Sequence, residues 1–160
     1  KSEMMRIGGV GMAARASGLK RDIRASHPYA AYASQIQHES IVKRHGDVMA
    51  RLTMRCSEVL QSADYIEQLL ATYTPTEIAR PDYEAPMVAE SLAFSLIEGW
   101  RGEICHVATT NAQGEIATYK IKDPSLHNWL ALAIAVRGEG ISDFPICNKS
   151  FNLSYCGHDL

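Results

Sequence analysis

The sequence has no long apolar segment. Its most apolar stretch, Trp129 to Val136, is far shorter than the roughly 18 to 20 residues that a transmembrane helix requires. The first residue is Lys1, and neither a charged-then-apolar leader nor a small-residue cleavage site follows it. We therefore expect no membrane span and no secretory signal, and we interpret the non-methionine start as that of a fragment.

Cysteine is also scarce. The four cysteines, Cys56, Cys105, Cys147 and Cys156, form no C-x-x-C pair, which argues against a disulfide framework and against a zinc ribbon. We expect a reducing, cytoplasmic setting. Cys56 lies on the apolar side of a predicted helix and is interpreted as core filler. Cys147, Cys156 and His158 offer three soft ligands without a fourth, so a zinc module is a minor alternative.

The motifs with strong catalytic signatures are absent as well. The sequence contains no P-loop, dinucleotide-binding fingerprint, H-E-x-x-H pair or G-x-S-x-G turn. The net charge of −2 argues against a polyanion binder, so we expect no nucleic-acid partner. Charge is uneven, however: ten lysines and arginines stand against four acidic residues up to Arg55, and six against fourteen beyond it. This asymmetry is typical of a surface that faces an acidic partner, or of a solvated basic edge.

The strongest periodic pattern follows Gly46 and predicts an amphipathic helix over Asp47–Thr72. Apolar residues recur there at three- and four-residue steps, namely Met49, Leu52, Cys56, Val59, Leu60, Ala63, Ile66 and Leu70. A second stripe consists of Arg51, Arg55, Glu58 and Ser62. Since most helices present a charged face to water, we interpret this second stripe as solvated.

Smaller elements are predicted around this helix. The opening glycine-rich segment is expected to be irregular with one short helix. The other expectations are a helix over Met87–Ile97, a hairpin of Ile104–Thr110 and Glu115–Lys122 joined by the loop Asn111–Gly114, a helix over Ser125–Val136, and an extended, turn-rich stretch over the last twenty residues. The pattern predicts a single domain over residues 1–160. Its expected class is a mostly helical α+β fold, with a long central amphipathic helix, shorter helices and one β-hairpin.

Arg101 is the side chain with the most suggestive surroundings. It lies in Glu98-Gly99-Trp100-Arg101-Gly102-Glu103, between a predicted helix and a predicted strand. The flanking glycines allow the backbone to approach another group closely. A planar guanidinium held there suits recognition of an anion or a polar ligand. Most such arginines hold a loop by an ion pair, and that interpretation stays open.

Several segments, in the same order, carry a family resemblance. They are Ala14-Arg15-Ala16-Ser17-Gly18, Asp22-Ile23-Arg24, His27-Pro28-Tyr29 with Tyr32, then Gly46-Asp47-Val48 with Arg51, Arg55, Glu58, Ser62 and Gln68, and Glu98 to Glu103, where Trp100 replaces the usual proline. Together they resemble the family that unites [NiFe]-hydrogenase large subunits with the 49-kilodalton subunit of complex I. The resemblance spans nearly the whole chain as a C-terminal portion. It is closest in character to formate hydrogenlyase and energy-converting hydrogenase large subunits.

The resemblance implies roles for particular residues. Arg101 takes the place of the arginine beside the binuclear centre, which donates toward a cyanide ligand on iron. Pro124 and Ser125 are similar to the proline-serine segment on the other cyanide side, although the same two residues also suit a helix start. The resemblance thus assigns Arg101 and Ser125 as catalytic residues, and Arg101, Pro124 and Ser125 as cofactor-binding residues.

The terminal segment departs from the family pattern. The hydrogenases have aspartate-proline-cysteine-x-x-cysteine there, whereas this chain has Phe151 to Cys156, with Leu153 at one cysteine position and Cys156 at the other. An aliphatic side chain cannot ligate nickel. The resemblance therefore leaves Cys156 as a metal ligand, with His158 as a partial substitute. We expect the nickel-iron centre of the parent family to be incomplete or absent.

From this resemblance we predict a subunit, or a fragment of one, in a membrane-associated hydrogenase or NADH-quinone oxidoreductase-like complex, on the cytoplasmic face. The implied partners are an iron-sulfur small subunit and membrane subunits. Two functions stay open: a scaffold that forms part of a quinone or coupling cavity, which Leu153 favours, and an active large subunit for reversible hydrogen oxidation. By itself the chain is not expected to be a complete catalyst or to bind a cofactor.

Overall fold

The computed structural model describes residues 1–75 and 85–155. Its helices are α1 (Ser2–Arg6), α2 (Gly11–Ala16), α3 (Ile23–Ser26), α4 (Ala31–Ser34), α5 (Val48–Thr72), α6 (Pro124–Ala135) and α7 (Phe144–Phe151), with a 3₁₀ turn, η1 (Ile141–Asp143). The strands β1 (Leu92–Gly99), β2 (Gly102–Thr110) and β3 (Ile116–Lys122) form one antiparallel sheet in the order β1-β2-β3. The predicted α+β class is confirmed. Within the described ranges, no helix has the length and apolarity to span a membrane.

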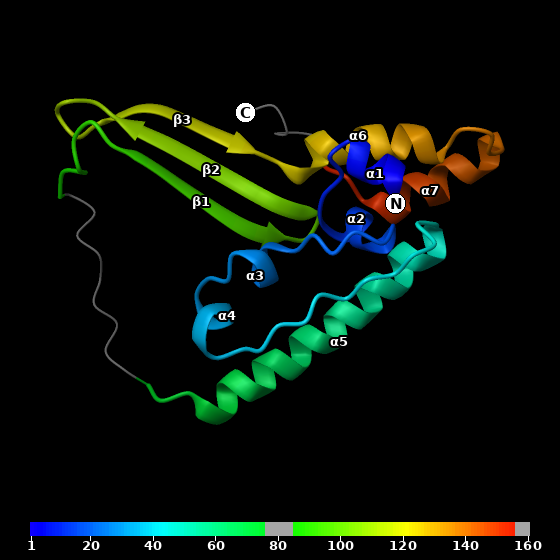
Figure 1. Ribbon diagram of the computed structural model, residues 1–160, viewed down its shortest axis with the longest axis horizontal. Helices are drawn as coiled ribbons and strands as arrows, with labels where there is room; N and C mark the ends of the chain where they lie inside the picture. Colours follow the sequence, from blue (N-terminus) through cyan, green and yellow to red (C-terminus); the bar gives the residue numbers. More distant parts are fainter. Residues whose placement is uncertain (76–84, 156–160) are drawn as a thin grey trace.

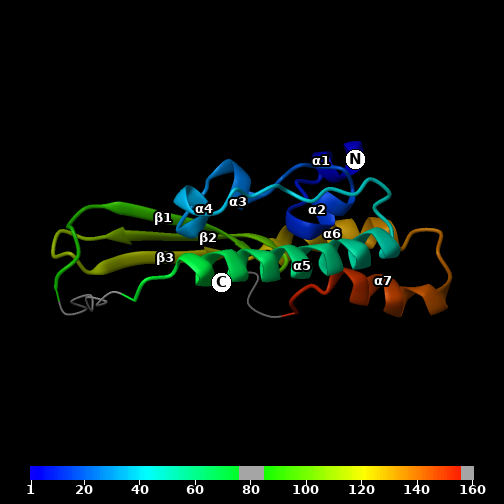
Figure 2. The same cartoon turned by 90° about the horizontal axis from the view of Figure 1, so that it is seen from below.

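The molecule is elongated (Figure 1). Helices α1, α2, α6 and α7 gather at one end, and the sheet and α5 both extend from this end and diverge. The view at a right angle shows α5 running along most of the molecule (Figure 2). The opening segment contains four short helices instead of the single one predicted, and α3 and α4 lie between the sheet and α5 (Figure 1).

Helix α2 lies in the middle of the helical end, and all of its residues are buried. Its small side chains allow other elements to approach it from two sides. On one side Met12 and Ala16 pack against Ala50 and Met54 of α5. On the other side, Ala13 joins an apolar cluster of Ala131, Leu132, Cys147, Phe151 and Leu153. The core therefore joins α2 to α5, α6 and α7, and no residue of the three strands belongs to either cluster.

Helix α5 confirms the helix predicted over Asp47–Thr72. Asp47 caps its first turn, where the Oδ1 atom accepts a hydrogen bond from the Ala50 N–H at 2.7 Å. The cap satisfies one of the N–H groups that a helix start leaves without a partner.

The predicted orientation of the two α5 stripes is wrong. Arg51, on the charged stripe, is only 3% exposed, whereas Leu52 and Leu60, on the apolar stripe, are 51% and 68% exposed. Cys56, predicted as core filler, is exposed too. Periodicity separates two faces of a helix, but it does not say which face meets the rest of the chain.

The predicted hairpin is confirmed, whereas the predicted helix over Met87–Ile97 is wrong. Strands β2 and β3 pair around a turn at residues 111–115, with a register shift between Thr109 and Thr110. Residues of the expected helix form β1 instead, which pairs with β2 from Leu92 opposite Thr109 to Gly99 opposite Gly102. The alternation of Leu92, Phe94 and Leu96 with smaller residues was the available signal. Pairing with a neighbouring strand overrides a weak local helix preference.

At the C-terminal end one prediction is confirmed and one is wrong. Helix α6 matches the helix predicted over Ser125–Val136, starting one residue earlier, at Pro124. The stretch predicted as extended contains α7, which has Pro145 in its first turn and ends at Asn152 in the left-handed conformation, with φ 54°. Proline suits a first helical turn and asparagine tolerates the left-handed C-terminal position, so both signals were present.

The turn between β1 and β2 lies directly against the start of α2. A Cβ atom added to Gly11 would lie 2.2 Å from the Gly102 Cα and 2.4 Å from the Arg101 carbonyl oxygen. Both glycines have positive φ values, +60° and +137° respectively. Two backbones approach so closely here that only glycine fits on either side.

This contact yields a test of the fold. Gly11→Ala should lower the free energy of unfolding by more than about 3 kcal/mol, because it combines a left-handed φ with a backbone clash. Gly138→Ala is the matched control, since Gly138 also has a positive φ of +80° but no atom within 4 Å of the added Cβ. We expect the control to cost about 1–2 kcal/mol. Denaturant unfolding of the purified proteins measures both, and equal losses would contradict the proposed close contact.

Candidate functional site

Arg101 lies in the two-residue turn between β1 and β2, where Gly99 pairs with Gly102. Its Nε–H donates a hydrogen bond to the carbonyl oxygen of Asn152, just after α7. Its own carbonyl oxygen accepts a hydrogen bond of 3.3 Å from Asn128 Nδ2 of α6. The arginine thereby connects the sheet turn to the C-terminal segment.

Ser125 lies at the start of α6 and is fully buried, and Pro124 beside it is buried too. The Asp123 Oδ1 atom caps the helix by accepting from the Ser125 N–H at 2.7 Å. The Ser125 hydroxyl oxygen accepts a hydrogen bond of 3.0 Å from the backbone N–H of Ser154. Pro124 and Ser125 therefore do start a helix, and the serine hydroxyl also reaches the C-terminal segment.

Arg101 and Ser125 are the two catalytic residues that the resemblance assigns. Both contact the segment of residues 152–154. Arg101 binds the carbonyl of Asn152, and Ser125 binds the N–H of Ser154. The side chain of Leu153, between them, packs in the apolar cluster with 5% exposure. Cys156, the predicted metal ligand, lies outside the described residues. The roles that the resemblance assigns to these residues stay predictions.

Of the three residues in the minor zinc hypothesis, only Cys147 lies within the described part of the chain. Cys147 is buried, with 6% exposure, and its Sγ lies 3.9 Å from Arg51 Nη2. Residues 1–75 and 85–155 contain no group of three or more His, Cys, Asp or Glu side chains with a geometry that could hold a metal ion. His158 lies beyond these ranges.

A buried network of charges joins the N-terminal segment to β1 and α5. Arg15 Nη1 lies 2.6 Å from Glu98 Oε1, and Arg15 Nη2 lies 2.7 Å from Glu58 Oε1. The side chains of Arg15 and Glu98 are only 2% and 3% exposed. Arg24 Nη2 binds the same Glu58 oxygen at 3.0 Å. Glu58 of α5 thus binds both Arg15 and Arg24, and Glu98 of β1 binds Arg15.

Asp22 extends this network to a buried histidine. Its carboxylate accepts from Arg24 Nε at 2.9 Å and lies 2.9 Å from His38 Nε2. The other His38 nitrogen, Nδ1, lies 3.0 Å from the Tyr65 hydroxyl of α5. Burial by itself would raise the pKa of Asp22, but the hydrogen bonds of Arg24 and His38 and the charges of both arginines hold this pKa well below its usual range. Asp22 is therefore a carboxylate that stays ionised.

The pKa of Glu98 shifts in the opposite direction from that of Asp22. Burial raises the pKa of Glu98 above its usual value. Arg15 acts in the opposite direction, and so does the backbone N–H of Ile23, which lies 3.1 Å from Glu98 Oε2, because both favour the ionised form. A carboxylate with little contact with water needs both partners to stay charged. Glu98 thus depends strongly on Arg15.

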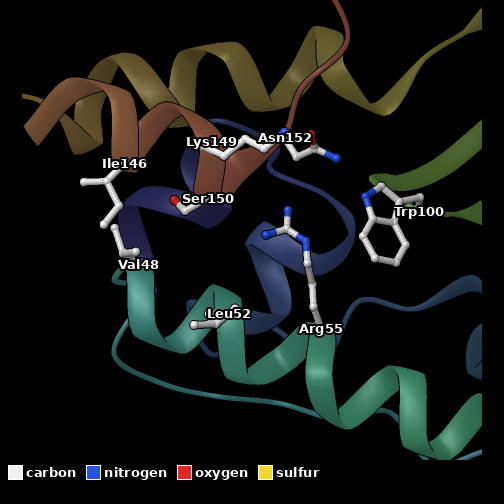
Figure 3. Close-up of a pocket in the computed structure, with 8 residues that line it drawn as sticks. All are labelled: Val48, Leu52, Arg55, Trp100, Ile146, Lys149, Ser150 and Asn152. Atoms are coloured by element: carbon white, nitrogen blue, oxygen red, sulfur yellow. The ribbon is translucent and has the colours of Figure 1, made fainter.

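A pocket of about 370 Å³ opens between α5 and α7, beside the β1–β2 turn (Figure 3). It is lined by Val48, Leu52, Arg55, Trp100, Ile146, Lys149, Ser150 and Asn152. Arg55 projects from α5 into this space, donates to the Phe151 carbonyl oxygen at 3.1 Å, and lies 5.6 Å from the Trp100 ring centroid (Figure 3). Burial, and secondly the positive charge of Arg101, lower the pKa of Arg55.

Sequence reasoning missed both the network and the pocket. Arg15 and Glu98 lie 83 positions apart in the chain, so no spacing rule joins them. Periodicity alone places the α5 residues Arg55 and Glu58 on a solvated stripe, yet both meet other segments of the chain. The order of the family-like segments was the only signal that these residues act together.

The network predicts a large effect of removing its central cation. Arg15→Met should lower the free energy of unfolding by about 3–5 kcal/mol, because it leaves Glu98 charged, buried and unpaired. Adding Glu98→Gln to this variant should restore part of the loss, since the uncompensated charge is removed. Arg6→Met, whose side chain is 80% exposed beside Glu3, should change stability by less than about 0.5 kcal/mol. Denaturant titrations that give similar losses for Arg15→Met and Arg6→Met would contradict a buried network.

The Asp22 carboxylate predicts a pH dependence. Because its folded-state pKa is depressed, its contribution is fully present above its unfolded-state pKa, near 4, and is lost as the pH falls toward the lower folded-state value. Between about pH 5 and pH 2 the unfolding free energy of the wild type should therefore fall more steeply than that of Asp22→Asn. Denaturant midpoints at several pH values measure the two slopes, and parallel slopes would rule out this origin of acid sensitivity.

Comparisons with known proteins agree with this architecture. A solved structure of the membrane-bound sulfane sulfur reductase, described as an archaeal respiratory membrane complex, superposes with a TM-score of 0.82 at 26% identity over 97% of this chain and 43% of that chain. The carbon monoxide-induced hydrogenase of Rhodospirillum rubrum is 33% identical over 145 residues, covering 89% of this chain and 39% of the relative. One subunit of the NADH-quinone oxidoreductase of Helicobacter hepaticus is 30% identical, covering 91% and 42%.

Formate hydrogenlyase subunit 5 of Escherichia coli is 27% identical over 91% of this chain, which covers 25% of its length. The chain thus spans about two fifths or less of these curated relatives. A family model described as the 49 Kd subunit of respiratory-chain NADH dehydrogenase matches residues 1–92, more than half of the chain. Sequence order, fold and this match agree, and the chain belongs to the family of the 49 Kd subunit of respiratory-chain NADH dehydrogenase.

Proposed function

We propose that this chain serves as a scaffold in the large subunit of a membrane-associated redox complex. It forms part of a quinone or coupling cavity beside an iron-sulfur subunit, and its nickel site is incomplete. The relatives include a hydrogenase, a formate hydrogenlyase subunit and an NADH-quinone oxidoreductase subunit. These names support a place in a multi-subunit electron-transfer assembly, with membrane subunits as further partners on the cytoplasmic face.

The environment of Leu153 carries this proposal. By the resemblance, Leu153 stands at a position where hydrogenases have a nickel-binding thiolate. Its side chain packs in the apolar cluster with Leu132 and Phe151 and is only 5% exposed. A position used for core packing is not available to a metal, and an aliphatic group offers no ligand atom.

The contacts of Arg101 and Ser125 within the chain are compatible with a structural role. Each of them binds the backbone of the segment that contains Leu153, one at the Asn152 carbonyl and the other at the Ser154 N–H. These bonds hold the terminal segment against α6 and the β1–β2 turn. In this chain the two side chains act as positioning residues of the cavity wall.

A four-thiolate nickel centre does not fit the described residues. Leu153 cannot ligate, and Cys147 is buried beside the Arg51 guanidinium at 3.9 Å, where it faces the protein interior. Cys156 lies outside the described ranges and supplies at most one further thiolate. We therefore derive no step of hydrogen chemistry from this chain.

The second candidate function is an active hydrogenase large subunit. One observation favours it: Arg101 and Ser125, at matching positions of the family motifs, converge on the terminal segment as a shared metal pocket would require. In that case Arg101 would donate toward an anionic ligand of the centre, and charge assistance would strengthen the bond. Three of the four thiolates would have to come from outside the terminal segment.

Nickel content and hydrogen evolution of the purified intact complex discriminate between the two functions. We expect nickel well below one atom per large subunit, and hydrogen evolution from a reduced mediator that does not exceed the background of a preparation without this chain. Arg101→Ala should leave that background unchanged and lower the melting temperature, because a bond that holds the terminal segment is lost.

Arg101→Lys is the matched control, since it keeps the positive charge and loses the planar donor geometry. Stoichiometric nickel, together with hydrogen evolution that Arg101→Ala abolishes, would overturn the scaffold proposal and support the second function.

A further inference from the structure

The outward side of α5 is an unusual surface for a folded chain. Its large apolar side chains are more than half exposed: Met49 63%, Leu52 51%, Val59 56%, Leu60 68%, Ile66 57% and Leu70 66%. They follow one stripe along a 25-residue helix, which is roughly 37 Å long at 1.5 Å per residue. Contiguous exposed apolar surface of this extent marks an interaction site.

The pocket between α5 and α7 lies at the N-terminal part of this stripe. Leu52 belongs to both, and Trp100 and Ile146, at 57% and 60% exposure, extend the apolar surface across the pocket mouth. Figure 3 shows Arg55 projecting from α5, which also carries Leu52, toward the α7 residues Lys149 and Ser150. The pocket therefore adjoins the N-terminal part of the stripe, where its positively charged side chains lie.

The polar end is positively charged, and its charge is only partly offset, because Glu58 acts on Arg55 from a distance but pairs with Arg15 and Arg24. Arg55, Arg101 and Lys149 gather around the end of α7, and within residues 1–75 and 85–155 no carboxylate forms an ion pair with any of them. Arg55 and Arg101 bind backbone carbonyl oxygens there, those of Phe151 and Asn152. A half-buried guanidinium is stabilised far more by a carboxylate than by a carbonyl dipole.

We propose that this pocket receives an acidic side chain from an apolar segment of a partner polypeptide. The carboxylate binds Arg55 and Lys149, and the apolar residues on either side of it pack against Trp100 and the outward stripe of α5. The inference rests on the proposed place of this chain in a multi-subunit complex and specifies the chemistry of one partner.

A polypeptide fits this surface better than a small anion does. The pocket alone, at about 370 Å³, would hold a small amphipathic acid. Such a ligand would leave the stripe from Val59 to Leu70 exposed to water, because that part of α5 extends beyond the pocket. A segment that covers both the cations and the stripe satisfies the charge and the apolar surface together.

Lys149 makes the proposal directly testable, because its amine lies at the pocket. A water-soluble carbodiimide joins an amine to a carboxylate without a spacer, so a bond forms only between groups in contact. Treatment of the purified native complex, followed by mass spectrometry, should join Lys149 to an aspartate or glutamate of another subunit, flanked by apolar residues. Lys149→Arg keeps the charge, should keep the assembly intact, and should lose this cross-link.

A second measurement does not depend on cross-linking efficiency. Arg55→Gln should reduce the fraction of this chain recovered with the cross-linked subunit by at least fivefold at moderate salt, because the buried carboxylate loses its strongest partner. Lys20→Gln, a loss of one exposed positive charge outside the pocket, should leave that fraction unchanged.

The outcomes separate this inference from the proposed function. An intact complex without a Lys149 cross-link, in which Arg55→Gln still assembles normally, would overturn the pocket assignment alone. A cross-link from Lys149 to a carboxylate of this same chain, such as Glu77, Asp82 or Glu84, would also overturn it. Isolation of the chain without any partner polypeptide would overturn both the inference and the proposed scaffold role.

Discussion

The rest of the structure depends on one buried guanidinium. Arg15, on the fully buried helix α2, binds Glu98 of β1 at 2.6 Å and Glu58 of α5 at 2.7 Å. The apolar clusters join α2 to α5, α6 and α7 but include no strand residue, and this ion pair provides a buried link between the sheet and the long helix. Removing either charge would leave the other in a site from which water is excluded, and such a loss costs far more than a surface ion pair.

The contacts of the charged stripe of α5 decide which face of this helix turns toward the rest of the chain. Because Arg51, Arg55 and Glu58 find carbonyl, hydroxyl and guanidinium partners inside the chain, the charged stripe turns inward. The apolar stripe is consequently left outside. A helix with its polar face buried and its apolar face exposed is typical of one piece of a larger assembly, in which other chains complete the burial.

The terminal segment is held in place from two sides by side chains of other elements. Arg101 of the β1–β2 turn and Ser125 of α6 both bind the backbone of residues 152–154. Leu153, between the two contacts, packs its side chain in the apolar cluster. The segment is therefore held by two backbone hydrogen bonds and by the burial of one apolar side chain.

The sequence by itself determined the local elements with strong signals: the helix after Asp47, the hairpin around Asn111–Gly114 and the helix that starts near Pro124, since capping, turn and periodicity rules act over a few residues. Residue order also identified the family. The strand over Leu92–Gly99, the direction in which α5 faces and the Arg15–Glu98 pair were decided only by the tertiary structure. These features arise between segments far apart in the chain, where the free energy of burial and pairing outweighs local preference.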